Sequence, residues 1–452
     1  MKSLKLFFYF LLLFSSALAR QEVRQMNLRQ CTDAALQTNV ALKISHANVE
    51  AADARVREAF TTLLPQIRLS GRFAQLSDID PFAFTAPGFG TVTLFPNIDH
   101  SYSARVSLQQ PLFTGFRLLN TLKATRLNAD ATQEEFRKDE ADLLLEVTTT
   151  YWNLYRAIRV EEFLKQTVEQ VSEHLNDINN FFRQGLVTQN EVYKVEVQQA
   201  DVQVKLLEAQ NARRLLNMAL NNLLGLPLET TVIPTEDPEP HAREGEHVDT
   251  SFAVPSVLIR NALANRPELK ALRLRKEMSE AGVSAARAGW FPQLSLVAGY
   301  DYARPNPRII PPKDRWEGTW DVGLALQWNL WDWLATAHQS SQAEAAVQKA
   351  AAGLELLERA IALQVFQHYA TMQQARERRL VAKRGVDQAV EHHRVTNERF
   401  KQGVATSTDL LDAEIALLQA KLNATQAQVD YQIARAQVIR AAAITPGPTT
   451  ER

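Results

Sequence analysis

Four short runs of the chain alternate between apolar and polar residues, which is the pattern of a β-strand with one apolar face. They cover about residues 65–76, 101–113, 292–303 and 318–331. Runs of about ten residues with aromatic side chains near their ends are typical of strands in a transmembrane barrel. A soluble, half-buried sheet gives the same alternation, so the pattern alone leaves both open. In a barrel, the lipid-facing side chains of the last run would be Trp320, Val322, Leu324, Leu326 and Trp328.

A different periodicity follows each pair of strands. Segments 117–181 and 335–399 contain almost no proline and few glycines, which predicts helices of about 60 residues or more. After each segment, apolar residues recur at spacings of three and four, the seam of a coiled coil. We therefore expect two long helical hairpins, about 117–225 and about 335–440. A shorter helical pattern near 30–63 precedes the first strand.

The chain is an internal repeat. Residues 182–196, FRQGLVTQNEVYKVE, return 218 positions later as FKQGVATSTDLLDAE, and LLPQIRLSG at 63–71 returns as WFPQLSLVA at 290–298. Because the order of features is preserved, the sequence predicts two tandem repeats, about 20–226 and 257–441. A proline-rich linker, 227–256, separates them, and a tail, 442–452, follows. The predicted fold class is mainly α with a small β part.

The repeated segment at 182–196 and 400–414 falls where each helical hairpin must turn. Gly185 and Gly403 are suited to end the incoming helices, because glycine readily adopts a left-handed conformation. Thr188, and Thr406 or Ser407, can cap the outgoing helices. Glu191 and Asp409 then lie in the first helical turn, where a negative charge is favourable.

The N-terminus and the composition narrow the function. Residues 1–19 combine two lysines, an apolar run and Ala17-Leu18-Ala19, as expected for a cleaved signal peptide of an exported protein. Beyond it, no stretch approaches the roughly 18 consecutive apolar residues of a membrane-spanning helix, so a membrane-spanning chain would use its strands. Cys31 is the only cysteine, and the net charge of −1 gives no reason to expect a nucleic acid partner.

Catalytic and metal-binding motifs are not apparent in the sequence. Glu391-His392-His393 lacks metal-ligand spacing, and His46, His174, His338 and His368 occur singly on helical segments, as solvated or packed histidines do. We therefore expect no catalytic residues, no cofactor and no metal site, and a protein that is not an enzyme.

The signal peptide, the two strand–helix repeats and the turn sequences FRQGLVTQNEV and FKQGVATSTDLLDAE resemble the TolC family of outer-membrane efflux proteins. This resemblance implies a homotrimer whose twelve strands form one barrel in outer-membrane lipid, above an α-helical tunnel through the periplasm. It also implies a periplasmic adaptor and an inner-membrane transporter as partners, in tripartite efflux or type I secretion. The alternative is a soluble periplasmic or surface coiled-coil scaffold without a pore. The residues alone do not predict the cargo or the adaptor.

The resemblance also assigns roles at the turns, where plain helix capping is the competing explanation. A pair of aspartates that narrows the tunnel in the family matches Asp409 and Asp412, and Glu191 occupies the equivalent of Asp409 in the first repeat. Carboxylates repeated in three copies would form rings that attract cations and raise some of their own pKa values. The sequence departs from the best-known member at Ala405, where that member has an arginine that helps to hold the tunnel shut, and at Phe400, which lacks a hydroxyl. The residues expected to meet the adaptor are Gly185, Leu186, Val187, Thr188, Gly403, Val404, Ala405 and Thr406.

Overall fold

The computed structural model describes residues 23–88, 90–95, 97–238 and 254–444. The predicted signal peptide lies outside these residues, as do most of the tail and residues 239–253 of the predicted linker. The chain forms two compact units. One contains the described residues up to His46, residues 135–269 and those from Leu357 onward, and the other contains residues 47–134 and 270–356. Each unit combines segments of both sequence repeats, so a repeat is not a spatial domain.

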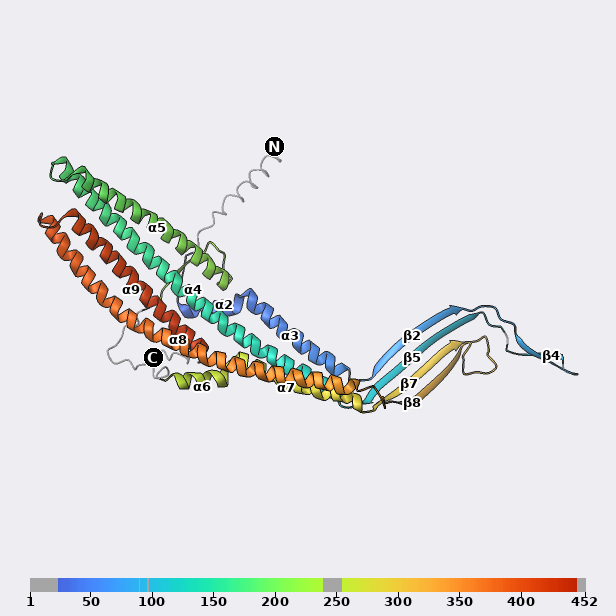
Figure 1. The fold of residues 1–452 in the computed structure, drawn as a ribbon. Coiled ribbons are helices and arrows are strands. Elements are labelled where there is room, and N and C mark those ends of the chain that lie inside the picture. The colour runs from blue at the N-terminus through green and yellow to red at the C-terminus, as the bar shows by residue number, and fades with distance from the viewer. Residues whose placement is uncertain (1–22, 89, 96, 239–253, 445–452) are drawn as a thin grey trace, which may run out of the picture. The chain divides into compact units, whose positions relative to one another are not determined.

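The second unit contains a four-stranded antiparallel sheet in the order β2-β5-β7-β8 (Figure 1). Its strands are β2 (Gln66–Gln75), β5 (His100–Phe113), β7 (Gln293–Arg304) and β8 (Glu317–Gln327). The central pairing of β5 with β7 joins the two repeats. Leu69 lies opposite Val106 and Tyr300 opposite Trp320, so the apolar parity predicted for each strand gives one apolar face. Within the described residues, β2 and β8 are the edges of this sheet.

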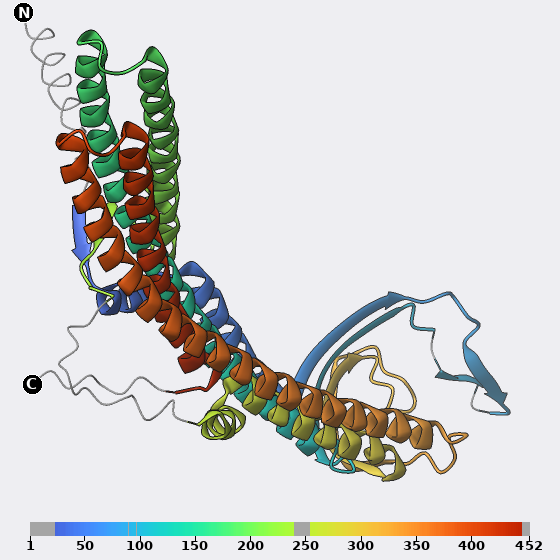
Figure 2. The ribbon, with the colours of Figure 1, turned by 60° about the vertical axis from the view of Figure 1, so that its left-hand side comes forward.

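The structure differs from the sequence prediction at two places in this unit. The last strand ends at Gln327, and Trp328 follows it, with its indole Nε1 donating a hydrogen bond to the carbonyl oxygen of Trp290 at 3.2 Å. The loop after β2 contains a further hairpin, β3 (Phe82–Ala86) and β4 (Gly90–Phe95), visible in Figure 2. The glycines of its turn, Gly88 and Gly90, have positive φ values of 90° and 75°. This turn chemistry favours a short hairpin over an irregular loop.

Long helices follow the strands in both repeats. The first repeat has α4 (Arg117–Arg183) and α5 (Gln189–Leu224), and the second has α8 (Ala335–Lys401) and α9 (Ser407–Ala441), close to the predicted hairpins. The strand-to-helix corners match at a shift of 218: Gly115 and Phe116 have φ values of 61° and 66°, and Trp333 and Leu334 have 53° and 65°. Left-handed backbone at a non-glycine residue costs about 1–2 kcal/mol. Its presence at equivalent positions of both repeats indicates that the same turn is needed to lead each strand into its long helix. Among the described helices, none is long and apolar enough to cross a membrane.

Shorter helices precede each strand pair. The helix predicted near 30–63 is two helices, α2 (Leu28–Thr38) and α3 (Val40–Thr61), because Asn39 breaks it. The Asn39 side chain donates to the carbonyl of Leu223 at 3.2 Å and accepts from the amide of Leu42 at 3.2 Å. In the second repeat, α6 (Pro255–Asn265) and α7 (Pro267–Ala286) are separated before Pro267, which disfavours helical backbone at the preceding residue.

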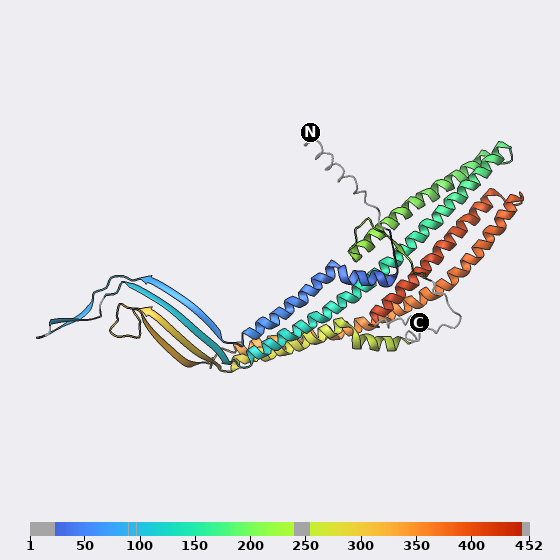
Figure 3. The same ribbon diagram turned by 180° about the vertical axis from the view of Figure 1, so that it is seen from behind.

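In the first unit, the two helical hairpins lie side by side with their turns at the same end (Figure 3). One core cluster surrounds the fully buried Tyr151 and includes Cys31, Leu154 and Leu220. The Tyr151 hydroxyl donates to the carbonyl of Met26 at 3.2 Å. Met26 ends β1 (Val23–Met26), which pairs in parallel with β6 (Thr231–Pro234). The start of the predicted linker is therefore an ordered strand, held because its backbone pairs with the N-terminal segment.

Candidate functional site

The turn between α4 and α5 forms the first hairpin tip. Gly185 has a φ of 73°, and the amide of Leu186 donates to the carbonyl of Phe181 at 2.9 Å. This bond closes the end of α4 in the manner expected for a glycine C-cap. Thr188 occupies the N-cap position of α5, but its side chain makes no capping hydrogen bond. The predicted capping role of Gly185 is confirmed, whereas the Thr188 side chain does not form the capping hydrogen bond that was predicted for it.

The turn between α8 and α9 repeats this geometry and adds a complete capping box. Gly403 has a φ of 73°, and the amide of Val404 donates to the carbonyl of Arg399 at 2.8 Å. Thr406 Oγ1 accepts from the amide of Asp409 at 3.2 Å, while Asp409 Oδ2 accepts from the amide of Thr406 at 2.8 Å. Two backbone donors are satisfied reciprocally, which fixes the start of α9.

The three carboxylates assigned to the constriction lie in the first turns of the outgoing helices. Hydrogen bonds from the backbone and side chain of Thr406 hold the pKa of Asp409 below its usual range, so this group stays charged. Asp412 is exposed one turn further along the same face of α9. Glu191, on α5, forms an ion pair with Lys194 at 2.7 Å. The structure therefore brings Asp409 and Asp412 onto one exposed surface, whereas Glu191 pairs with a lysine of its own helix.

Each tip also exposes one large apolar side chain. Leu186 is 67% exposed and Val404 is 64% exposed. Val187 instead packs against a cluster that contains Val171 and Ile178 of α4. Exposing aliphatic side chains to water is unfavourable, and a partner that covers them removes this cost. Leu186 and Val404 are therefore suited to a contact surface. The remaining predicted tip residues are exposed or half-buried in the same two turns: Gly185, Thr188, Gly403, Ala405 and Thr406.

Behind the tips, the structure reveals two buried polar groups that the sequence reasoning did not assign to the site. His174 on α4 lies between Val171 and Ile178 in the buried seam, and its Nε2 is 2.9 Å from Ser407 Oγ. Glu414 on α9 is 6% exposed, and its Oε2 has no hydrogen-bond partner among the described residues. Burial raises the pKa of Glu414 to about 7. The spacing of three and four around His174 is the signal that could have placed it in the core.

The sheet of the second unit has the predicted apolar face. Trp320, Val322, Leu324 and Leu326 alternate along β8 and are exposed in the single chain, and Trp328 lies just beyond the strand end. The same face continues across β7 and β2, where Tyr300 and Leu69 are exposed. Aromatic side chains gather near both ends of the strands: Phe73, Tyr102, Tyr302, Trp316 and Trp320 at one end, and Phe113, Trp290, Phe291 and Trp328 at the other.

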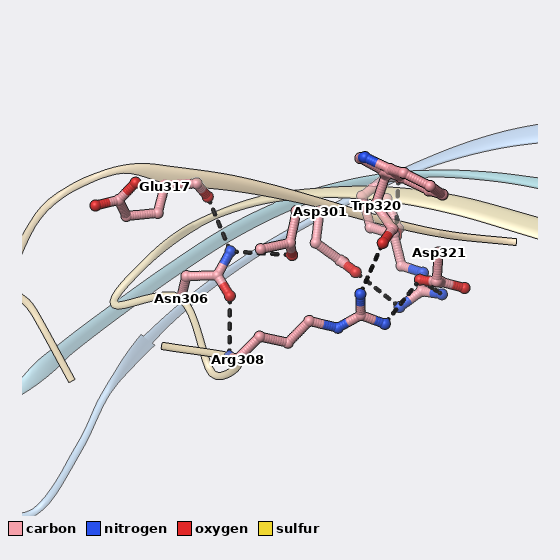
Figure 4. A network of polar contacts seen from close by, with 9 residues as sticks. Asp301, Asn306, Arg308, Glu317, Trp320 and Asp321 are labelled. Atoms are coloured by element: carbon pink, nitrogen blue, oxygen red, sulfur yellow. Dashed lines mark hydrogen bonds and ion pairs between the residues drawn. The ribbon is translucent and has the colours of Figure 1, made fainter. Parts of the chain in front are cut away.

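The opposite face of the sheet is polar and carries a network of charged side chains. Arg105 Nη1 of β5 lies 3.0 Å from Asp301 Oδ2 of β7, and Arg105 Nη2 lies 3.6 Å from Asp321 Oδ1 of β8. Arg308, from the loop after β7, reaches the same Asp321 (Figure 4). Such a face needs water or other polar groups, whereas the apolar face needs lipid or protein. In the described part of the chain, no group of three His, Cys, Asp or Glu side chains is arranged to hold a metal ion.

Comparison with known proteins agrees with this architecture. The family model described as outer membrane efflux protein matches residues 32–226 and 258–443. Toxin and drug export protein A of Aggregatibacter actinomycetemcomitans is 26% identical over 346 residues, which are 73% of this chain and 71% of that protein. The outer membrane protein TolC of Vibrio cholerae is 23% identical over 422 residues, 92% of this chain and 90% of that protein.

Solved structures give the same fold. The outer membrane channel CmeC of Campylobacter jejuni superposes with a TM-score of 0.76 at 18% identity, and the match covers 92% of this chain and 85% of CmeC. At this level of identity the likeness is one of fold. The matched segments include both strand pairs and both helical hairpins.

Proposed function

This chain belongs to the outer membrane efflux protein family, and on that basis we infer that it is the outer-membrane channel through which an efflux or type I secretion system passes its cargo out of the cell. The related toxin and drug export protein supports an export role. An outer-membrane channel with its helices in the periplasm would receive cargo from an inner-membrane transporter. We assign this chain no chemical reaction and no cofactor, because the proposed role needs only a passage.

We propose that three copies of the chain form the channel. The observation that carries this proposal is the open four-stranded sheet, whose edge strands β2 and β8 each pair with only one neighbouring strand among the described residues. Barrels of a single chain begin at about eight strands, so four strands cannot close. Three copies would supply twelve strands, with β8 of one copy paired to β2 of the next. Pairing would also remove the exposed edges, which otherwise favour aggregation.

The two faces of the sheet suit such a barrel in outer-membrane lipid. A closed barrel would turn the face of Trp320, Val322 and Leu324 outward and the face of Arg105 and Asp301 toward an aqueous lumen. Aromatic side chains near both strand ends would lie at the two lipid–water interfaces. A soluble scaffold, the alternative function, would leave a large apolar face in water, which is unfavourable.

In the proposed duct, the hairpin tips would serve as docking and gating elements. Leu186 and Val404 are exposed apolar groups that a periplasmic adaptor would cover. Asp409 and Asp412 of three copies would form two carboxylate rings at the narrowest point. The Lys194 ion pair makes Glu191 a weaker contributor to such rings than the two aspartates.

Localisation and crosslinking in cells test this proposal. If the chain is an outer-membrane channel, the native protein should sediment with outer-membrane vesicles. Recovery in the soluble fraction without detergent would favour the scaffold. A photo-reactive side chain or cysteine placed at Val404 should crosslink to an adaptor. The matched control is Val429, which is fully buried in the same helical hairpin and should not crosslink. Crosslinks from Val404 only to other copies of the chain would contradict adaptor docking.

A further inference from the structure

The loop between β7 and β8, residues 305–316, folds onto the polar face of the sheet. A cavity of about 570 Å³ lies between them. Ser101 and Ser103 of β5 line it on the sheet side, and Pro307 and Ile309 line it on the loop side. Because β5 is separated from β8 by β7, the loop covers strands that are not its immediate neighbours in sequence.

The beginning of the loop is fixed by a buried side chain. Asn306 is 1% exposed. Its Nδ2 donates to the carbonyl of Glu317 at 2.9 Å and to Thr319 Oγ1 at 3.2 Å, and its Oδ1 accepts from the amide of Arg308 at 3.0 Å. A buried amide with its donors and acceptor satisfied favours one conformation of the chain around it.

Arg308 joins the loop to the charged network of the sheet. Its Nη1 donates to the carbonyl of Trp320 at 2.8 Å, and its Nη2 donates to Asp321 Oδ1 at 3.2 Å (Figure 4). Asp321 in turn lies beside Arg105, which pairs with Asp301. Positive and negative groups therefore alternate from the loop across β8, β5 and β7. Each charge is partly compensated by the next, and the loop supplies the cation at the end of this series.

The end of the loop is held differently. Trp316 stacks on Tyr302 with ring centroids 4.9 Å apart, and Arg304 forms two hydrogen bonds to Asp314 at 2.7 and 2.9 Å. The loop is thus anchored at both ends, and Arg308, two residues after Asn306, ties the first part of the loop to β8.

We propose that the β7–β8 loop is a lid that narrows the outer mouth of the duct and that Arg308 is its fastener. The inference rests on the proposed function, because the polar face borders a lumen only when several copies close a barrel. The loop lies at the strand ends remote from the corners that lead into α4 and α8, which is the outer side of such a barrel. Since half-exposed ion pairs contribute little, the lid is fastened weakly enough to open.

Accessibility of a cysteine beneath the lid tests this proposal in intact cells. Ser103→Cys would be treated from outside with a maleimide attached to a bulky polyethylene glycol chain. Labelling should be about fivefold faster when Arg308→Gln is added, as expected for loss of a hydrogen-bonded but half-exposed charge. Arg308→Lys should give an intermediate rate, because lysine keeps the charge but cannot donate from two guanidinium nitrogens to Trp320 and Asp321 at once. The chain without Ser103→Cys gives the background, since its one cysteine, Cys31, is buried.

The matched control is Arg315→Gln, which removes the same charge from the same loop but affects a pair with Glu317 at the strand start. It should leave the labelling rate unchanged. Equal rates with and without Arg308→Gln would overturn the lid.

A second experiment, with a small charged maleimide, distinguishes failure of the lid proposal from failure of the proposed channel function. The small maleimide should label Ser107→Cys on the polar face faster than Val106→Cys on the apolar face, and the reverse order would contradict a polar lumen.

Discussion

The imidazole ring of His174 stacks on the phenyl ring of Phe400, with their centroids 5.2 Å apart and their planes inclined by 18°. Together with the contact to Ser407, this places one side chain of α4 against both helices of the second hairpin. Burial lowers the pKa of His174, and the nearby charge of Asp177 opposes this only in part. The neutral ring is therefore the form that fits the interface between the two hairpins.

The first prediction is that acid loosens the tips through His174. Because its pKa is lowered in the folded chain, its contribution to stability is fully present above about pH 6.5, the usual value, and is lost as the pH falls through the lowered pKa. Hydrogen-exchange protection at residues 178–192, measured relative to the intrinsic exchange rate at each pH, should be lower at pH 5.5 than at pH 7.5, and His174→Gln should reduce this difference. The control His338→Gln, at an exposed position, should not. An unchanged pH response in His174→Gln would contradict the assignment.

Glu414 predicts the opposite pH dependence. Its pKa is raised to about 7, so the folded chain binds a proton more tightly than the unfolded chain. Stability from the protonated form is lost as the pH rises from about 4.5 through 7, by at most about 3 kcal/mol. Glu414→Gln, which stays neutral, should therefore raise the denaturation midpoint at pH 8.5 and change it little at pH 5. Equal effects at both pH values would exclude a buried titrating carboxyl.

The two turns supply a matched test of helix capping. Thr406→Ala should destabilise the start of α9 by about 1 kcal/mol, because it removes one half of the capping box. Thr188→Ala at the equivalent position of α5 should cost much less, since the Thr188 side chain makes no capping hydrogen bond. Hydrogen exchange over residues 407–412 and 189–194 measures both effects. Equal losses in the two variants would contradict the asymmetry.

Neighbouring residues on β8 test the lipid-facing assignment. Leu324→Arg should impair barrel assembly by about 2–4 kcal/mol, because its side chain, 65% exposed in the single chain, would face the middle of the bilayer. Gly323→Arg should be tolerated, because an added Cβ at Gly323 meets no atom within 4 Å and points to the polar face. Trimer yield in outer-membrane preparations reports the difference. Equal yields would argue against a membrane barrel.

Much of the fold follows from local pattern. The strict alternation in β7 and β8 and the long glycine-poor segments of α4 and α8 placed these elements to within a few residues, because periodicity of two or of three and four is a short-range property. The glycines that end α4 and α8, Gly185 and Gly403, were also predicted from the sequence. Strand β6 was not predicted, because it forms by backbone pairing with β1, more than 200 residues away in sequence.

The site was harder to derive for the same reason. His174 and Ser407 are 233 residues apart, and the pattern of α4 alone does not reveal that they meet. The conformation of the β7–β8 loop depends on contacts of Asn306 and Arg308 with β8, and no local sequence motif predicts these contacts. The break at Asn39 likewise depends on the carbonyl of Leu223. Besides β6, the β3–β4 hairpin and the break between α2 and α3, the features that the sequence did not predict are long-range polar contacts.

Single-channel recording in a planar bilayer tests the account most directly. The purified protein should form discrete cation-selective channels that trivalent cations block. The variant with Asp409→Asn and Asp412→Asn should still form channels, since an asparagine oxygen can accept the capping bond from Thr406, but it should lose the selectivity and the block. Absence of channels in the wild-type protein would contradict the duct itself. Unchanged selectivity and block in the variant would mean that the two aspartates only support the start of α9.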